Sequence, residues 1–166
     1  MKRVSERRQR LRVLKQQAIP SNCTDPDIFR RIAMLVEGTL DSALFRTGAI
    51  VGECRADRAD IRLYKNAKQR AKKQGLPFEI TVEDVCVRIP RDNRCPIILK
   101  TFEKGSGKVG PCSMSLDRVI PYLGYTRDNI VIISHLANTV KQNCVNPEIF
   151  RRVARYVEFG TGSSCL

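Results

Sequence analysis

Residues 115–141 constrain the fold more than any other part of the chain. The pattern predicts a strand, a turn that contains Gly124, a second strand over the apolar run of residues 130–133, and then a helix. Ser134 is a residue type that caps helix N-termini, which places the helix directly after the second strand and predicts that it runs to about Gln142. This order of elements predicts a small fold that mixes helix and strand.

Polar residues fall at the junctions of this predicted unit. Asp117 lies near the end of the first strand, Asn129 lies in the turn before the second strand, and Asn138 lies about one turn into the helix. His135 stands three residues before Asn138 and shares its helical face. These four side chains are therefore candidate functional residues.

The spaced combination Ser-x-Asp-Arg, Gly-Tyr, Asp-Asn and Asn-x-x-Lys in this unit resembles the HNH, or ββα-metal, endonuclease family. A basic helix, a Gly-Leu-Pro-Phe turn and a Cys-Pro pair upstream are similar to phage-encoded members of that family. The resemblance covers residues 60–158. It implies an α+β fold with a ββα-metal (HNH-like) core and additional flanking helices.

The resemblance also implies a chemistry. Asp117 matches the family's metal-binding Asp, Asn138 matches the ligand on the helix, and Asn129 matches the loop residue that braces the hairpin. Oxygen ligands of this kind suit Mg²⁺, with Mn²⁺ as an alternative. In the family, the metal stabilises charge on the scissile phosphate while a general base activates water.

The sequence departs from the family at the general base, because Arg118 follows Asp117 where the family has His. A guanidinium stays protonated at neutral pH, so Arg118 is expected to clamp a phosphate or to stabilise transition-state charge. His135 is open to three readings, as a replacement base, as a third metal ligand, or as an ordinary polar residue at the helix start. Asp117 has a structural alternative as well, an ion pair within the protein.

Three functions remain open on these residues. The first is a metal-dependent endonuclease that hydrolyses phosphodiester bonds, with Arg118, His135 and Asn129 as catalytic candidates and Asp117 and Asn138 as metal ligands. The second is a catalytically silent protein of the same fold that binds nucleic acid or inhibits a host enzyme. The third is a structural or interaction protein.

Basic charge indicates a polyphosphate partner. The chain has 30 Lys and Arg against 17 acidic residues, a formal net charge of +13, which is typical of nucleic-acid-binding proteins. A merely basic protein and an anionic membrane surface are the alternatives, and we expect nucleic acid, DNA rather than RNA, and no membrane. A helix predicted over residues 58–74 and ended by Gly75 is either a phosphate-tracking helix or a solvated face. The candidate nucleic-acid contacts are Arg62, Lys65, Lys68, Arg70, Lys72, Lys73 and Lys141.

An internal repeat relates residues 22–33 to residues 143–154. Each copy begins with a helix-capping residue and a proline, Asp25-Pro26 in the first and Asn146-Pro147 in the second, followed by Ile-Phe-Arg-Arg. We expect a duplicated helix packed on the core or on its twin. The alternative is a homodimer in which such a helix is exchanged.

The expected organisation is a basic N-terminal arm and helical extension (residues 1–57), an HNH-like nucleic-acid module (58–160) and a C-terminal tail (161–166). Short helices are expected around residues 42–46 and after Thr81, a strand over residues 95–99, and a loop over residues 104–111. The seven cysteines include no Cys-x-x-Cys pair, so reduced thiols and no zinc site are expected. With no signal peptide or membrane span recognised, we expect a cytoplasmic protein, in the host cytoplasm if it is phage-encoded.

Overall fold

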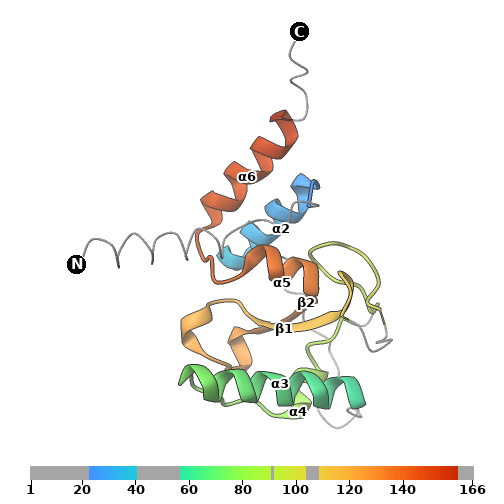
Figure 1. The fold of residues 1–166 in the computed structure, drawn as a ribbon, viewed down its shortest axis with the longest axis vertical. Helices are drawn as coiled ribbons and strands as arrows, with labels where there is room; N and C mark the ends of the chain where they lie inside the picture. Colours follow the sequence, from blue (N-terminus) through green and yellow to red (C-terminus); the bar gives the residue numbers. More distant parts are fainter. Residues whose placement is uncertain (1–22, 41–56, 91, 104–108, 161–166) are drawn as a thin grey trace, which may run out of the picture.

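The computed structural model describes residues 23–40, 57–90, 92–103 and 109–160. Within them it is an α+β fold (Figure 1). The elements in chain order are α2 (Pro26–Glu37), α3 (Arg58–Gln74), α4 (Val82–Cys86), β1 (Met114–Arg118), β2 (Ile130–Ser134), α5 (His135–Lys141) and α6 (Pro147–Gly160). Two 3-10 turns, Pro121–Leu123 and Arg127–Asn129, lie in the connection between the strands. The coarse class expected from the sequence is therefore confirmed.

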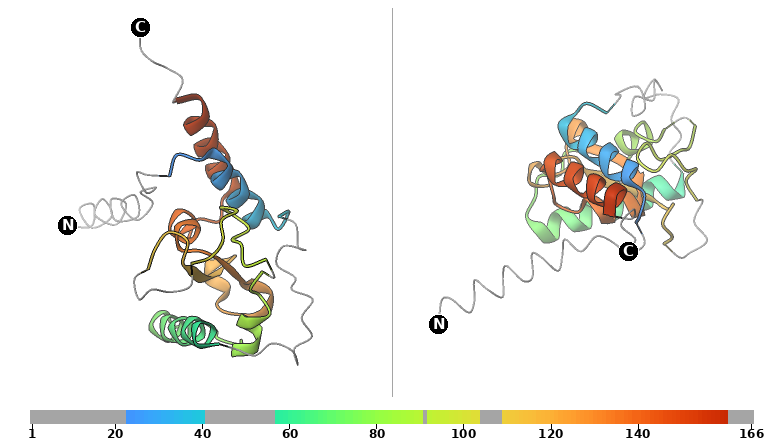
Figure 2. Two further views of the ribbon diagram at one scale, coloured as in Figure 1. Left: turned by 90° about the vertical axis from the view of Figure 1, so that its right-hand side faces the viewer. Right: turned by 90° about the horizontal axis from the view of Figure 1, so that it is seen from above.

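The two strands form an antiparallel hairpin at the centre of the molecule. Asp117 pairs with Val131 and Arg118 with Ile130. All five residues of β2 are buried. Helix α3 packs on one side of the hairpin and α5 on the other, while α2 and α6 lie beyond α5 (Figures 1 and 2). Since side chains alternate along a strand, Ser115 and Asp117 share the face of β1 that meets α5.

Helix α3 begins and ends where its capping residues predict. Asp57 accepts hydrogen bonds from the backbone of Ala59 and Asp60, and Asp60 in turn accepts one from the backbone of Asp57. Gly75 closes the helix in the left-handed conformation, with φ of 65°. The buried stripe of this helix is short and is formed by Leu63, Ala67 and Ala71 together with Asp60. The rest of α3 is left free to carry charge.

The repeated helices α2 and α6 pack on each other, which confirms one of the arrangements expected from the repeat. Phe29 and Phe150, which hold the same place in the two copies, are both buried. Two reciprocal ion pairs join the helices, Arg30 with Glu158 and Arg151 with Glu37. The arginines are equivalent to each other in the repeat and so are the glutamates, so the two ion pairs are related by an approximate two-fold symmetry.

The local expectations have mixed outcomes. The helix capped by Thr81 is present, with a capping box that involves Asp84. The expected strand at residues 95–99 is wrong, because these residues form a turn in which the Leu99 N–H donates to the Cys95 carbonyl at 2.8 Å and Leu99 has φ of 55°. The expectations for residues 1–17, 42–46, 161–166 and most of 104–111 lie outside the described residues.

The structure also bears on two further expectations, that the cysteines are reduced and that the chain has no membrane span. Among the described residues Cys23, Cys95, Cys112 and Cys144 are free thiols. Cys86 takes part in a disulfide, so the expectation of reduced thiols is wrong for this residue. No helix in the described part of the chain is long and apolar enough to cross a membrane.

Candidate functional site

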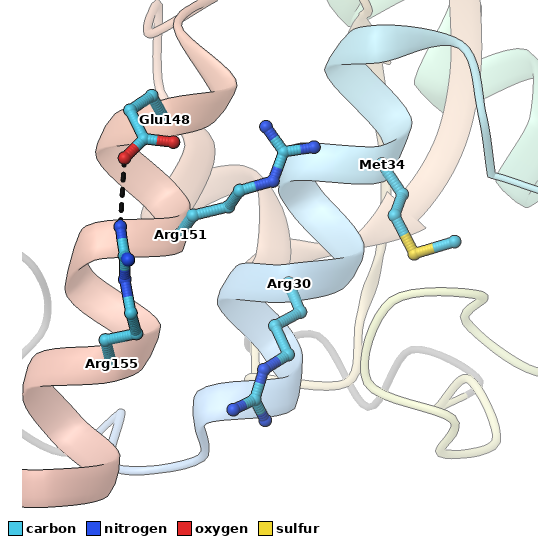
Figure 3. Close-up of a pocket in the computed structure, with 5 residues that line it drawn as sticks. All are labelled: Arg30, Met34, Glu148, Arg151 and Arg155. Atoms are coloured by element: carbon cyan, nitrogen blue, oxygen red, sulfur yellow. Dashed lines mark hydrogen bonds and ion pairs between the residues drawn. The ribbon is translucent and has the colours of Figure 1, made fainter.

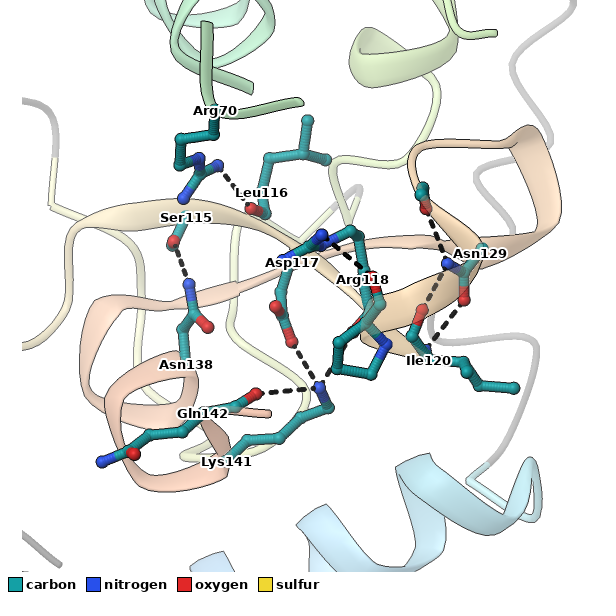
Figure 4. Close-up of polar contacts among 12 residues, drawn as sticks. Arg70, Ser115, Leu116, Asp117, Arg118, Ile120, Asn129, Asn138, Lys141 and Gln142 are labelled. Carbon is teal, nitrogen blue, oxygen red and sulfur yellow. Dashed lines mark hydrogen bonds and ion pairs between the residues drawn. The ribbon is translucent and has the colours of Figure 1, made fainter. Parts of the chain in front are cut away.

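Asn129 braces the long turn between the strands. Its Oδ1 accepts from the Ile120 N–H at 2.8 Å, and its Nδ2 donates to the carbonyls of Ile120 at 2.8 Å and Gly124 at 2.7 Å. The residue is buried. Asn129 therefore acts through the backbone that it fixes (Figure 4), as the resemblance implied for the loop Asn.

Gly124 is the tight point of that turn. It has φ of 73°, and a Cβ at this position would lie 2.4 Å from the backbone oxygen of Pro77. The Tyr125 N–H donates to the same oxygen at 2.9 Å, which joins the turn to the segment that follows α3. Only glycine fits here, so the Gly-Tyr pair of the motif has a physical explanation.

Arg118 is held against the protein rather than extended into solvent. Its guanidinium carbon lies 5.0 Å from the centre of the Tyr125 ring, and its Nη1 donates to the Pro121 carbonyl at 2.9 Å and to Gln74 Oε1 at 3.2 Å. The Tyr125 ring is only 1% exposed, so this tyrosine is a core residue. Arg118 thus has a fixed orientation at the end of β1, with guanidinium edges left to bind an anion.

Asp117 faces a buried lysine. Lys141, at the last position of α5, is fully buried, and its Nζ lies 3.0 Å from Asp117 Oδ2. The same ammonium donates to the Arg118 carbonyl at 2.8 Å. Within the described residues Asp117 Oδ2 accepts no well-aligned hydrogen bond, so the contact is an ionic one. Burial raises the pKa of Asp117, and the Lys141 ammonium opposes that rise.

This pair changes the interpretation of Lys141. The sequence suggested a phosphate contact or a solvated side chain, whereas the structure places Lys141 in the core, against Asp117. Asp117 therefore forms an ion pair within the protein, which was the alternative to its role as a metal ligand. Its partner is Lys141 and not the neighbouring Arg118. The sequence signal was the Asn-x-x-Lys spacing, which puts Lys141 one helical turn after Asn138 on the same face of α5.

Asn138 makes the second link between α5 and β1. Its Nδ2 donates to Ser115 Oγ at 2.7 Å. Ser115 and Asp117 are two residues apart on β1, and Asn138 and Lys141 are three apart on α5, so the two links run side by side (Figure 4). The structure brings the two expected metal ligands to the same strand–helix interface, with each side chain engaged by another residue.

The donor set does not fit a divalent ion as it stands. A metal bound to Asp117 would have the Lys141 ammonium as a close neighbour. Repulsion between a divalent ion and an ammonium about 4 Å apart is of the order of 8 kcal/mol at an effective dielectric of about 20. The described residues also contain no cluster of three His, Cys, Asp or Glu side chains that would hold a metal ion.

His135 lies at the exposed first position of α5. Its backbone N–H donates to the Ser113 carbonyl at 2.8 Å, and its carbonyl accepts from Thr139 Oγ at 2.8 Å. These contacts fix the start of the helix and involve only the His135 backbone. They give no support to a role of the imidazole as base or ligand, and that role stays a prediction.

The basic residues of α3 form one exposed surface. All seven are exposed, namely Arg58, Arg62, Lys65, Lys68, Arg70, Lys72 and Lys73. Arg70 also holds α3 to the hairpin, because its Nη2 donates to the Leu116 carbonyl at 3.0 Å. No acidic side chain in the described part of the chain forms an ion pair with any of the seven. This surface, hereafter the α3 basic face, is available to phosphates.

Two pockets were not predicted from the sequence. One, of about 400 Å³, adjoins Arg118 and is lined by Gln74, Leu76, Arg118, Pro121, Tyr122, Asn143 and Val145. The other, of about 470 Å³, lies between α2 and α6 and is lined by Arg30, Met34, Glu148, Arg151 and Arg155 (Figure 3). The only sequence signal for the first was an apolar Tyr122-Leu123 pair in a turn.

Comparison with known proteins gives no further assignment. No protein-family model, curated protein or solved structure matches the chain.

Proposed function

We propose that the chain is a nucleic-acid-binding protein built on an HNH-like ββα module in which a buried lysine takes the place of the metal ion. The observation that carries this proposal is the Asp117–Lys141 pair at 3.0 Å. The module binds nucleic acid, with DNA as the favoured partner, and does not hydrolyse it.

The ββα assignment rests on the order and contacts of three elements. β1, β2 and α5 follow one another, and α5 packs on both strands. Asp117, Asn129 and Asn138 occupy the strand end, the braced turn and the helix that the family resemblance requires. These placements support the proposed module, while Arg118 stands at the position that corresponds to the family's general base.

The pair explains why the module is silent. Lys141 supplies a positive charge next to Asp117, as a metal would, but an ammonium is not a Lewis acid and cannot coordinate and activate a water or a phosphate oxygen. Arg118 cannot take a proton from water at neutral pH. The residues of the motif therefore support folding and anion binding better than hydrolysis.

Binding is assigned to the α3 basic face. Its charges lie along one helix on the outer side of the hairpin, and a nucleic-acid backbone supplies a regular row of negative charge. A location in the cytoplasm, or in the host cytoplasm for a phage protein, is consistent with such a partner. A homodimer through the repeated helices is not needed, because α2 and α6 pair within one chain.

The second candidate is the metal-dependent endonuclease, with Mg²⁺ or Mn²⁺ held by Asp117 and Asn138. It is favoured by one observation, that both residues reach the same interface between β1 and α5. It requires Lys141 to leave Asp117, and a base other than Arg118.

One experiment separates the candidates. Supercoiled plasmid, single-stranded DNA and RNA are incubated with wild type and with Asp117→Ala, with Mg²⁺, Mn²⁺ or EDTA. Binding of the same nucleic acids is measured by fluorescence anisotropy between about 50 and 200 mM salt. We expect no cleavage, and binding that weakens steeply with salt.

The control variants locate the binding surface. Lys72→Ala/Lys73→Ala is compared with Arg94→Ala/Lys100→Ala, which removes the same charge from exposed positions outside α3. Only the first should weaken binding and flatten its salt dependence. Metal-dependent cleavage that Asp117→Ala abolishes would overturn the silent module in favour of the endonuclease, and absence of binding would overturn both.

A further inference from the structure

The pocket beside Arg118 has the composition of a nucleobase site. It lies where the C-terminal end of α3, the turn after β1 and the connection between α5 and α6 meet. Its lining contains two amides, one guanidinium, one aromatic ring and three aliphatic side chains, with no acidic residue. A planar heterocycle with polar edges is matched by such a mixture.

Tyr122 is the unusual member of this lining. Its side chain is 70% exposed, whereas Tyr125, three residues later, is 1% exposed. Val145 on the same pocket is 40% exposed. An aromatic ring and an aliphatic side chain presented to solvent at a pocket provide a surface on which a base can stack.

The same pocket is lined by polar groups. Gln74 and Arg118 are joined through Gln74 Oε1 and Arg118 Nη1, which leaves the Gln74 amide nitrogen and further guanidinium N–H groups to bind a ligand. Asn143 contributes a second exposed amide. Amides bind the donor and acceptor edges of bases, and a guanidinium binds phosphate.

The pocket is continuous with the α3 basic face. Gln74 is the last residue of α3, and Lys72 and Lys73 precede it in the last turn of the helix. A nucleic-acid strand whose phosphates lie along α3 would therefore reach the pocket at the C-terminal end of this helix. The pocket between α2 and α6 lacks this property, because Arg30, Arg151 and Arg155 are each paired with a carboxylate.

We propose that this pocket receives an unpaired nucleobase stacked on Tyr122, with the amides of Gln74 and Asn143 at its edge and Arg118 towards its phosphate. The preferred ligand is then single-stranded nucleic acid, since a base within a duplex is stacked on its neighbours and does not expose its faces. This inference rests on the proposed nucleic-acid-binding function and names its substrate class.

The test uses the full chain and two labelled probes, a 12-nucleotide oligothymidylate and a duplex of the same length. Affinities are measured by anisotropy for wild type, Tyr122→Ala, Tyr122→Phe and Tyr156→Ala. Tyr156 is the matched control, since it is 78% exposed on α6 and lies outside the pocket. Tyr122→Ala should lose roughly tenfold in affinity for the single strand, while Tyr122→Phe and Tyr156→Ala remain close to wild type.

A stacking readout separates a direct contact from a structural effect. An oligonucleotide that carries one 2-aminopurine should lose fluorescence on binding wild type and Tyr122→Phe, and should lose less on binding Tyr122→Ala at saturation. Equal single-strand affinity and equal quenching in Tyr122→Ala would overturn the inference. If Lys72→Ala/Lys73→Ala still weakens binding in that case, the proposed function stands without the pocket, whereas failure of wild type to bind any probe removes both.

Discussion

Replacement of Lys141 by methionine tests the buried ion pair most directly. Methionine preserves most of the length of the side chain and removes only the charge. Asp117, whose side chain is 11% exposed, is then left as a buried carboxylate without its ammonium. Removal of one partner of a buried pair costs roughly 3–5 kcal/mol. At about 2–4 °C per kcal/mol for a chain of this size, Lys141→Met should lower Tm by about 6 to 20 °C.

The pH dependence of this loss has a definite sign. Burial holds the pKa of folded Asp117 above its ordinary value of 3.8, and loss of the Lys141 ammonium raises that pKa further. A raised folded-state pKa means that stability is fully present below the unfolded pKa and is lost as pH rises through the folded pKa. The destabilisation by Lys141→Met should therefore be largest at neutral pH and shrink on acidification.

The measurement is urea unfolding followed by circular dichroism at pH 7 and pH 5. Lys100→Met, at an exposed position, is the control and should change stability by less than about 0.5 kcal/mol. Asp117→Asn/Lys141→Met removes both charges and should recover part of the loss. A Lys141→Met protein as stable as wild type, or one whose loss the double variant does not reduce, would refute the ion-pair reasoning.

Four further substitutions test the turn around the site and the packing of α2 on α6. Asn129→Ala leaves three backbone groups without their partner and should cost roughly 3 kcal/mol in urea unfolding. Gly124→Ala sets a Cβ 2.4 Å from the Pro77 oxygen and should lower Tm clearly, and an unchanged Tm would contradict the close approach. Phe150→Ala empties a buried position between α2 and α6 and should cost about 3–5 kcal/mol in urea unfolding, whereas Arg30→Ala, in an exposed ion pair, should leave Tm within experimental error.

The sequence predicted those features that depend on local rules. The bounds of α3 followed from its charge pattern and Gly75, and the hairpin followed from the strand pattern and the turn at Gly124. The bracing role of Asn129 was implied only by the family resemblance. The strand expected at residues 95–99 is absent because Pro96 interrupts the apolar run and the backbone turns there, with a positive φ at Leu99. Local propensity does not reveal such a turn when the residues are apolar and β-branched.

The pairings between distant residues were beyond local rules. The Asn-x-x-Lys spacing places Lys141 on the same face of α5 as Asn138, but a lysine is almost never fully buried, so the spacing alone did not predict that Lys141 pairs with Asp117. The repeat showed that α2 and α6 have equivalent faces, but equivalent faces fit each other equally well within one chain or between two. In the structure the two faces meet within one chain, with Arg30 on Glu158 and Arg151 on Glu37.

Arg118 has a structural role as well as a proposed role in binding, so a substitution of Arg118 cannot separate a loss of stability from a loss of binding. The Arg118 guanidinium is fixed by the Pro121 carbonyl and the Tyr125 ring, so a bound phosphate would meet a side chain that has already lost its rotamer freedom. Any substitution of Arg118 disturbs that turn as well as the proposed ligand contact. Tyr122 stands in the same turn but is 70% exposed, so its ring contributes little to the core. A binding loss at Tyr122 without a stability loss is therefore the result that assigns function to this turn.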